Sequence, residues 1–309
     1  MATKILVTGA NGFVGRHVVN ELKAHRYEVL AMGGNDTVSG MDTINLDLTN
    51  PQALAQIDFS DISGVIHLAG LAAVGPSFVE PLRYLSVNAG IEINIFETLL
   101  TRNSKPRFLI VSSGSLYDPG ASLPLDESSG VSPSSPYAVS KITQEELAFY
   151  YARRGFESIV ARPFNHIGPG QGLGFIVPDL AVQVAAYKRG ETNRILTGNL
   201  SAKRDYTDVR DIARAYRLLL EWGKAGEIYN VCSGTAISGK EILSKLVRAA
   251  GIRNFPVVTV DPSKKRPSDN PVIFGSHKKL TDATGWRPRI SIDTTIKDVM
   301  SEHLLQKRL

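Results

Sequence analysis

Short apolar runs alternate with longer amphipathic stretches through the first half of the chain. Each short run is rich in Val, Ile and Leu and ends close to a glycine or a polar residue, as buried parallel strands do. Strands are therefore predicted at 4–8, 28–32, 43–46, 64–69, 107–112 and 157–162. Helices are predicted between them, at 13–25, from Pro51 onwards, at 81–102 and at 136–155 after an N-cap at Ser135. The alternation predicts a doubly wound, parallel α/β sheet of the Rossmann type.

The alternation weakens after Pro163, where a glycine-rich loop covers 168–172. Helical patterns follow at 177–189, 209–222 and 239–250, and strand-like runs at 227–232 and 257–260. We interpret residues 1–165 as a dinucleotide-binding domain and residues 166–309 as a smaller, mixed α/β lobe for a substrate. The two parts are expected to be interleaved, because the run at 227–232 suits a strand that returns to the main sheet. Such sheets bind ligands outside the carboxyl ends of their strands, so the lobe is expected at that edge.

The composition is that of a globular protein, with 43% apolar and 21% charged residues. No stretch approaches the roughly 18 apolar residues of a membrane span, and the single cysteine, Cys232, is expected to be an inert core residue. A cytoplasmic protein without a metal site is the expectation. The net charge of +5 suits either solvated surface side chains or an anionic small molecule. Nucleic-acid binding is not expected, because the basic residues are scattered and have no aromatic residues among them.

Three glycines follow the first predicted strand, at Gly9, Gly12 and Gly15, with the spacing G-x-x-G-x-x-G. In dinucleotide-binding folds the first glycine allows a tight turn, the second lets a pyrophosphate approach the backbone, and the third lets the helix pack on the strand. The helix that follows offers free N–H groups and the positive end of its dipole to phosphates. The position of the triplet between a strand and a helix therefore predicts a dinucleotide site.

The end of the second predicted strand has no carboxylate for a ribose 2′-hydroxyl, because Gly33 and Gly34 stand there. Arg16 either meets a 2′-phosphate or faces solvent, and we expect NADPH as the cofactor, with NADH tolerated. Asp47 suits an adenine amino group, because an ionised carboxylate only accepts hydrogen bonds. The expected cofactor contacts are Gly9, Asn11, Gly12, Phe13, Val14, Gly15, Arg16, Asp47, Leu48, Leu68, Ala69, Gly70, Tyr137, Lys141 and Pro163.

Tyr137 and Lys141 are four residues apart in a predicted helix, so they lie on one face of it. An unperturbed tyrosine has a pKa of about 10 and is a poor base at neutral pH, but a nearby ammonium favours the phenolate. We expect Lys141 to lower the pKa of Tyr137 and to hold the cofactor ribose. Ser113, after the fifth predicted strand, is expected to orient the reacting oxygen, with Ser112 as the alternative. Ser113, Tyr137 and Lys141 are thus the expected catalytic residues, for proton transfer at an alcohol or carbonyl group.

Together these features resemble the extended short-chain dehydrogenases/reductases that act on nucleotide sugars, over nearly the whole chain. The resemblance rests on the segments 8–15, 67–70, 112–117, 137–141, 162–165 and 204–211. The segment 162–171 is most similar to the subgroup that reduces GDP-4-keto-6-deoxy-D-mannose to GDP-D-rhamnose, and 198–200, 203–205 and 266–269 support that subgroup. The resemblance also implies a homodimer formed through the helices predicted near 81–102 and 136–154.

The resemblance implies a set of substrate contacts besides Ser113. Asn165 would contact the substrate diphosphate, Arg204 and Arg266 would neutralise it, and Asp269 would reach the nucleotide ribose. An arginine suits a diphosphate because its planar guanidinium has five donors and a fixed charge, although each of these arginines also suits a surface ion pair. His166 either touches the substrate or is a structural, hydrogen-bonded histidine.

The sequence departs from the family in two places. Related 4,6-dehydratases have an acid, or an Asp-Glu pair, just after the serine or threonine position, where this chain has Gly114 and Ser115. Neither residue can act as that acid or base, so dehydration is not expected. Asp118 stands where the family usually has glycine, and the sequence offers no account of it.

The leading hypothesis is the NAD(P)H-dependent reduction of the C4 ketone of a nucleotide-linked 4-keto-6-deoxyhexose, with GDP-4-keto-6-deoxy-D-mannose as the substrate. The alternative is a nucleotide-sugar 4-epimerase that uses the same serine, tyrosine and lysine. A third class, a non-catalytic NAD(P)-binding sensor, is disfavoured because such proteins commonly lose the tyrosine or the lysine, and Tyr137 and Lys141 are both present.

Overall fold

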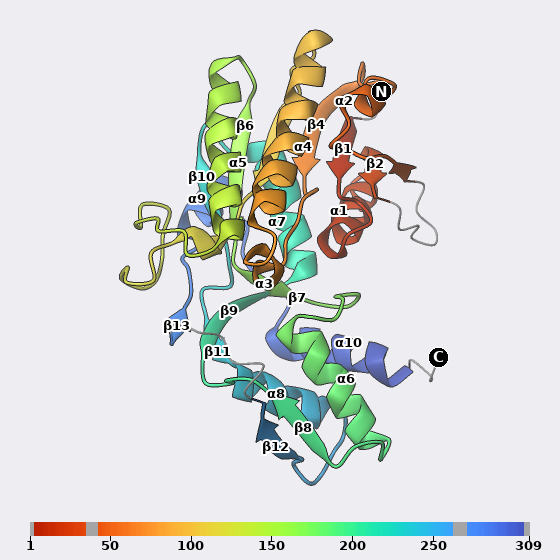
Figure 1. The fold of residues 1–309 in the computed structure, drawn as a ribbon, viewed down its shortest axis with the longest axis vertical. Helices are drawn as coiled ribbons and strands as arrows, with labels where there is room; N and C mark the ends of the chain where they lie inside the picture. Colours follow the sequence, from red (N-terminus) through yellow and green to blue (C-terminus); the bar gives the residue numbers. More distant parts are fainter. Residues whose placement is uncertain (1–2, 35–42, 262–270, 306–309) are drawn as a thin grey trace.

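Seven parallel strands form the main sheet, in the order β3-β2-β1-β4-β5-β6-β10 (Figure 1). The computed structural model describes residues 3–34, 43–261 and 271–305. The strand order reverses at β1 and β4, which is where doubly wound sheets open a ligand crevice. The doubly wound fold expected from the sequence is confirmed. The strands of this sheet are β1 (Lys4–Thr8), β2 (Glu28–Gly33), β3 (Ile44–Asn45), β4 (Ile62–His67), β5 (Arg107–Val111), β6 (Ser158–Pro163) and β10 (Ile228–Val231).

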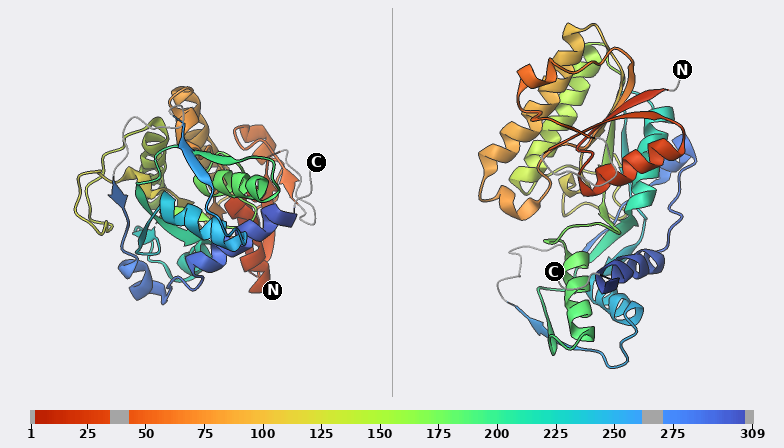
Figure 2. Two further views of the ribbon diagram at one scale, coloured as in Figure 1. Left: turned by 90° about the horizontal axis from the view of Figure 1, so that it is seen from below. Right: turned by 90° about the vertical axis from the view of Figure 1, so that its right-hand side faces the viewer.

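Helices cover both faces of the sheet (Figure 2). On one face lie α1 (Phe13–Ala24) and α7 (Val209–Trp222), and on the other lie α2 (Pro51–Leu54), α4 (Pro81–Thr101) and α5 (Pro136–Arg153). The long helices α4 and α5 pack against each other. The homodimer expected through these two helices stays a prediction.

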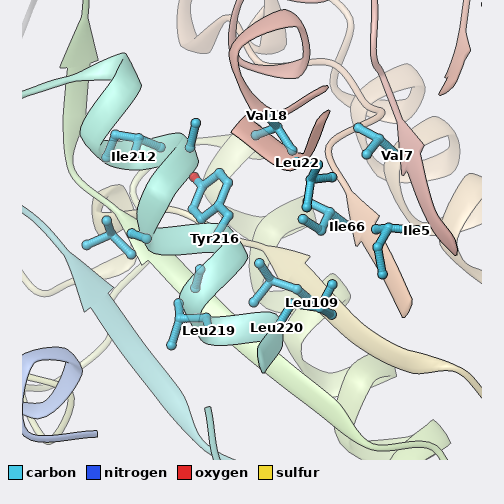
Figure 3. Packing of buried hydrophobic residues seen from close by; sticks show 14 of the residues in the cluster. Ile5, Val7, Val18, Leu22, Ile66, Leu109, Ile212, Tyr216, Leu219 and Leu220 are labelled. Atoms are coloured by element: carbon cyan, nitrogen blue, oxygen red, sulfur yellow. The ribbon is translucent and has the colours of Figure 1, made fainter. Parts of the chain in front are cut away.

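Side chains alternate between two cores along each strand, as the pleat of a strand requires. In β1, Ile5 and Val7 belong to the core under α1 and α7, whereas Leu6 belongs to the core under α4 and α5. Figure 3 shows Tyr216 of α7 in the first of these cores. Because both faces are buried, the strands are continuous apolar runs rather than alternating ones.

A smaller lobe lies below the sheet in Figure 1, at the carboxyl ends of the strands. Its mixed sheet is centred on β9 (Lys203–Asp208), which pairs in parallel with β7 (Asn165–Ile167) and β13 (Val272–Ile273) and antiparallel with β11 (Ala236–Ser238). The lobe has its own core, built largely from three helices. The smaller mixed lobe expected from the sequence is confirmed. The remaining elements of the lobe are α6 (Ile176–Lys188), α8 (Gly239–Ala249), α10 (Ile292–Leu305) and the parallel pair of β8 (Arg194–Thr197) and β12 (Val257–Val260).

The chain passes back to the main sheet after it has entered the lobe. Helix α7 packs on α1, and β10 joins the edge of the main sheet beside β6. Leu280 of α9 (Lys278–Thr284) and Trp286 are buried in the same core as α7, and the Trp286 indole donates a hydrogen bond to the carbonyl oxygen of Asp211 at 3.0 Å. The run at 227–232 therefore contributes a returning strand. The division of the chain at residue 165 stays a prediction.

The main sheet was easier to predict than the lobe. All predicted strands and helices are present, with ends shifted by a few residues, and Ser135 caps α5 by accepting a hydrogen bond from the N–H of Ala138 at 3.1 Å. Several short elements were missed: β7, β8, β9, β11, β13, α3 (Val74–Ser77), α9 and the longer α10. Strand β9 has the sequence Lys-Arg-Asp-Tyr-Thr-Asp, without an aliphatic residue, so its pattern gave no strand signal.

Candidate active site

The glycine turn joins β1 to α1 at the carboxyl edge of the sheet. Gly9 has a φ of +67°, and a Cβ there would lie 2.8 Å from the backbone nitrogen of Ala69. A Cβ at Gly15 would lie 2.2 Å from the carbonyl oxygen of Gly9, so only glycine lets α1 approach the turn this closely. Gly12 is the N-cap of α1, and no side chain caps the helix. The first N–H groups of α1, starting at Phe13 and Val14, are therefore available to a phosphate.

The end of β4 passes directly beside this turn. The Thr8 hydroxyl accepts hydrogen bonds from the backbone N–H groups of Leu68 and Ala69, each at 3.2 Å. Gly70 has a φ of +149°, and a Cβ there would lie 2.8 Å from Oδ1 of Asn88. These contacts hold the segment 68–70 next to the glycine turn. Its contact with a cofactor stays a prediction.

The ends of β2 and β3 complete this edge. The Asn11 side chain donates a hydrogen bond to the carbonyl oxygen of Gly34 at 3.0 Å. Gly34 follows β2 at the place where NAD-selective sites have a carboxylate. Asp47 accepts hydrogen bonds from the hydroxyl and the N–H of Thr49, which lower the pKa of the Asp47 carboxyl and keep it ionised. Leu48 is buried in the core under α4. The contacts of Asn11, Asp47 and Leu48 with a cofactor stay predictions.

The first turns of α1 also contact the lobe. Nη2 of Arg16 donates a hydrogen bond to the carbonyl oxygen of Gly170 at 2.9 Å, and the His17 ring bonds the preceding carbonyl of the same loop at 3.0 Å. Phe13 stacks on His166, with ring centroids 6.1 Å apart. Arg16 therefore faces the junction between sheet and lobe rather than open solvent. Its contact with a 2′-phosphate stays a prediction.

Ser113 and Tyr137 meet at the end of β5. Ser112 and Ser113 follow β5, Tyr137 lies in the first turn of α5, and the Ser113 side chain interacts with the Tyr137 phenol. The Ser113 hydroxyl also lies 2.9 Å from the hydroxyl of Ser115. Ser112 is 2% exposed, whereas Ser113 is half-buried. The structure therefore brings Ser113, and not Ser112, to the tyrosine.

The sequence analysis expected Lys141 to lower the pKa of Tyr137, and this expectation is wrong for the protein without a bound cofactor. The phenol is 8% exposed, and burial raises its pKa above the ordinary value, while the interaction with Ser113 offsets only part of that rise. The Lys141 ammonium lies 5.9 Å from the centre of the Tyr137 ring and donates its hydrogen bonds elsewhere. Tyr137 therefore stays protonated at neutral pH and is suited to donate a proton.

Lys141 is held in a buried polar pocket behind Tyr137. Its Nζ donates hydrogen bonds to the carbonyl oxygen of Val111 at 2.9 Å and to Oε1 of Gln144 at 2.8 Å. Burial lowers the pKa of Lys141 to about 8, against the opposing influence of the carboxyls of Glu92 and Glu145. The ammonium is thus fixed in place, and its charge is sensitive to neighbouring groups.

Three members of this pocket were missed by the sequence analysis: Gln144, Glu92 and His67. Nε2 of Gln144 lies 3.4 Å from Nε2 of His67, whose Nδ1 lies 2.8 Å from the Thr8 hydroxyl. Burial lowers the pKa of His67 to about 3, so the ring is neutral. Gln144 offered a signal, because it follows Lys141 by three residues and so shares its helix face. Glu92 and His67 lie on other elements and gave none.

Two predicted substrate contacts lie on the lobe sheet. Asn165 opens β7 and is paired with Tyr206 of β9, two residues from Arg204. Nη1 of Arg204 donates a hydrogen bond to the carbonyl oxygen of the preceding residue. The pairing of β7 with β9 therefore brings Asn165 and Arg204 to the same sheet. Strand β7 begins two residues after Pro163, the last residue of β6. The other two predicted contacts lie outside the described residues: Arg266 and Asp269.

The contacts of His166 fit a structural histidine. Its Nδ1 lies 3.1 Å from the carbonyl oxygen of Phe164, and burial lowers its pKa. Asp118, for which the sequence offered no account, accepts a hydrogen bond from the N–H of Gly120 at 2.8 Å and so closes a turn.

Packing also excludes a larger acidic side chain at Gly114, one of the two positions where related 4,6-dehydratases have their acid. A Cβ at Gly114 would lie 3.0 Å from the Phe164 ring, so a larger side chain there would displace that ring. The Ser115 hydroxyl is hydrogen-bonded to Ser113.

The described residues hold no cluster of three or more His, Cys, Asp or Glu side chains suited to a metal ion. None of the helices in the described ranges is long and apolar enough to cross a membrane.

Known proteins share both this sequence pattern and this fold. Residues 5–232 match the NAD dependent epimerase/dehydratase family. The chain belongs to this family. It is 35% identical to the GDP-6-deoxy-D-mannose reductase of Pseudomonas aeruginosa, over 98% of this chain and 97% of that protein.

Two solved structures are similar over nearly their whole length. The structure of RMD from Pseudomonas aeruginosa complexed with NADPH has a TM-score of 0.85 and 34% identity, and the match covers 99% of this chain and 100% of that one. The UDP-glucose 4-epimerase of Thermotoga maritima, solved with UDP-glucose, has a TM-score of 0.86 and 27% identity, with 97% and 98% covered. The family, the Rossmann-type fold and the enzyme class expected from the sequence are confirmed: the chain is an oxidoreductase that uses a nicotinamide dinucleotide.

Proposed function

We propose that this protein uses NADPH to reduce the C4 ketone of a GDP-linked 4-keto-6-deoxyhexose, converting GDP-4-keto-6-deoxy-D-mannose to GDP-D-rhamnose. The observation that carries the proposal is the meeting of Ser113 with the Tyr137 phenol, whose ring centre lies 5.9 Å from the ammonium of the buried Lys141, at the carboxyl edge of the sheet. The similarity to the GDP-6-deoxy-D-mannose reductase of Pseudomonas aeruginosa supports this substrate.

The protonation state of Tyr137 supports reduction of a ketone. A dihydronicotinamide held at the glycine turn and by Lys141 would supply a hydride for C4, and negative charge would develop on the ketone oxygen. Tyr137 donates its proton to that oxygen, for which the raised pKa of the buried phenol keeps a proton available at neutral pH. Ser113 donates a hydrogen bond to the same oxygen and stabilises the developing charge.

The choice of NADPH and of a diphosphate substrate has separate support. The end of β2 carries Gly34 in place of an acid, and Arg16 lies in the first turn of α1 with its guanidinium at the lobe junction. A 2′-phosphate suits an arginine and would be repelled by a carboxylate. Asn165 and Arg204 are proposed to hold the substrate diphosphate, and the Lys141 ammonium is proposed to hold the cofactor ribose.

The second candidate function is a nucleotide-sugar 4-epimerase. It is favoured by the similarity to the UDP-glucose 4-epimerase of Thermotoga maritima, and it would use the same serine, tyrosine and lysine. An epimerase oxidises and re-reduces one substrate, so it keeps its cofactor between turnovers. A reductase exchanges its cofactor at every turnover. The two functions therefore differ in cofactor retention and in net consumption of NADPH.

The experiment is an incubation with NADPH and GDP-4-keto-6-deoxy-D-mannose, with the product identified by NMR. We expect GDP-D-rhamnose to form with consumption of one NADPH per product, and the purified protein to show little nicotinamide absorbance. UDP-4-keto-6-deoxyglucose serves as the control for the nucleotide, and UDP-glucose without added cofactor serves as the control for epimerisation. Interconversion of UDP-glucose and UDP-galactose by protein that retains its cofactor would replace the proposal with the epimerase.

A further inference from the structure

A carboxyl group lies buried behind Lys141 and has no part in the proposed reaction. Glu92, on α4, is 0% exposed. Neither of its carboxyl oxygens has a hydrogen-bond partner of normal geometry within the described part of the chain. Burial raises the pKa of the Glu92 carboxyl well above its ordinary value, whereas the Gln144 amide and the Lys141 ammonium oppose that rise because they favour the ionised form. Gln144 connects the two helices here: its Nε2 donates a hydrogen bond to the carbonyl oxygen of Asn88, one turn before Glu92, at 3.3 Å, and its Oε1 accepts one from Lys141 at 2.8 Å. A buried carboxyl without partners is costly, so its position near an equally buried ammonium requires an explanation.

The second carboxylate near Lys141 is already paired. Glu145 accepts two hydrogen bonds from the Arg162 guanidinium, at 2.8 and 2.7 Å, and both side chains are 5% exposed. Its charge is therefore balanced by Arg162. Glu92 is the carboxyl near Lys141 that no arginine engages, so it is the one available to balance the charge of the ammonium.

The other titratable groups around the pocket carry no negative charge that would balance the Lys141 ammonium. His67, on β4, is neutral because burial lowers its pKa to about 3. Its Nδ1 faces the Thr8 hydroxyl at 2.8 Å, and its Nε2 faces the Gln144 amide at 3.4 Å. On α5, the buried phenol of Tyr137 keeps its proton. Gln144 bridges His67 and Lys141 without carrying a charge.

We propose that Glu92 is a positioning residue for the reduction: its buried carboxyl keeps Lys141 in the ammonium form across the working pH range. This inference rests on the proposed role of Lys141 in holding the cofactor ribose beside Tyr137. An ammonium buried without a counter-charge loses its proton at a lower pH, because the low-dielectric surroundings disfavour the charged form. With Glu92 in place, the attraction between its carboxylate and the ammonium opposes the effect of burial on both groups, and the pKa of Lys141 is about 8.

The test compares Glu92→Gln with Glu97→Gln. Glu97 lies on the same helix but accepts hydrogen bonds from Tyr151 and Arg154 at the surface, so its replacement removes one carboxylate without touching the pocket. For each variant and the parent protein, kcat/KM for reduction and the affinity for NADPH are measured as functions of pH. In Glu92→Gln, we expect both quantities to fall on the alkaline side at a pH lower by about one unit or more, the size of shift that an adjacent opposite charge causes. Glu97→Gln is expected to follow the parent profile.

Two further variants separate this role from a structural one. Glu92→Asp keeps the carboxyl and is expected to move the alkaline limb back towards the parent profile. Glu92→Met fills the same space without leaving an amide unpaired, so it serves if Glu92→Gln does not fold, and it is expected to show the same shift as Glu92→Gln. A purely structural role would lower the unfolding temperature and leave the pH profile in place.

The inference would be overturned if folded Glu92→Gln or Glu92→Met kept the alkaline limb of the parent for both activity and NADPH affinity. The proposed function can fail separately. In that case the parent protein reduces none of the 4-keto sugar nucleotides, while the pH dependence of NADPH binding still reports on Glu92.

Discussion

Replacing Tyr137 with phenylalanine is expected to lower kcat for reduction of the 4-keto sugar by about 10²–10⁴-fold, the usual contribution of a positioned general acid. The hydroxyl interacts with Ser113, and burial raises the pKa of the phenol, so that its proton stays in place at neutral pH. Phenylalanine removes that proton donor and fills the same buried space. Because the ring itself is retained, NADPH affinity is expected to remain within a few-fold of the parent value. Stopped-flow turnover and NADPH fluorescence titration measure the two quantities.

The matched control is Tyr151→Phe. Tyr151 lies on the same helix and is 2% exposed, but its hydroxyl donates a hydrogen bond to Glu97 of α4, whose side chain reaches the surface. Its replacement is expected to change kcat less than a few-fold. Turnover of Tyr137→Phe within a few-fold of the parent enzyme would remove Tyr137 from the role of proton donor.

Replacing Glu145 with glutamine is expected to lower the free energy of unfolding by about 3–5 kcal/mol, the usual result of breaking a buried ion pair by removing one partner. Glu145 binds the Arg162 guanidinium through two hydrogen bonds, and Arg162 also lies 5.0 Å from the centre of the Tyr117 ring. Glutamine leaves the arginine charge buried with one neutral acceptor. The pair joins α5, which carries Tyr137 and Lys141, to β6, so its loss also loosens the support of the site. Denaturant unfolding followed by circular dichroism measures the change.

Glu157→Gln is the control for this variant. Glu157 forms an ion pair with Arg107 at 2.7 Å, but its side chain is 63% exposed. Exposed pairs contribute about 0–1 kcal/mol because water and salt screen them. Equal destabilisation by the two variants would show that the buried pair has no special part in holding α5 on the sheet.

The main sheet was predictable because strands buried on both faces are continuous apolar runs that can be recognised in the sequence. Strands such as β1 and β5 are continuous apolar runs, and Gly9 and Gly15 mark a turn in which a Cβ would overlap the backbone. The lobe left a weaker record. Strand β9 is stabilised by polar contacts that are distant in sequence: Asp205 accepts hydrogen bonds from the N–H groups of Ser233 and Gly234. Contacts of this kind leave no periodic pattern.

The same contrast applies to the candidate site. Ser113, Tyr137 and Lys141 were predictable, because two of them share a helix face and the third follows a recognisable strand. The direction of the Tyr137 pKa was not predictable, since it depends on how deeply the fold buries the phenol and on where Lys141 directs its hydrogen bonds. Glu92 approaches Lys141 only because α4 packs on α5, which the sequence of either helix does not reveal.

The most direct test of the proposed function follows the hydrogen that is transferred. The protein is incubated in ordinary water with GDP-4-keto-6-deoxy-D-mannose and NADPH that carries two deuterium atoms at C4 of the dihydronicotinamide, and the sugar product is examined by NMR. We expect one deuterium at C4 of the product hexose, in the rhamnose configuration, and oxidised cofactor that keeps the other deuterium. A reduced sugar with ordinary hydrogen at C4 would contradict the account.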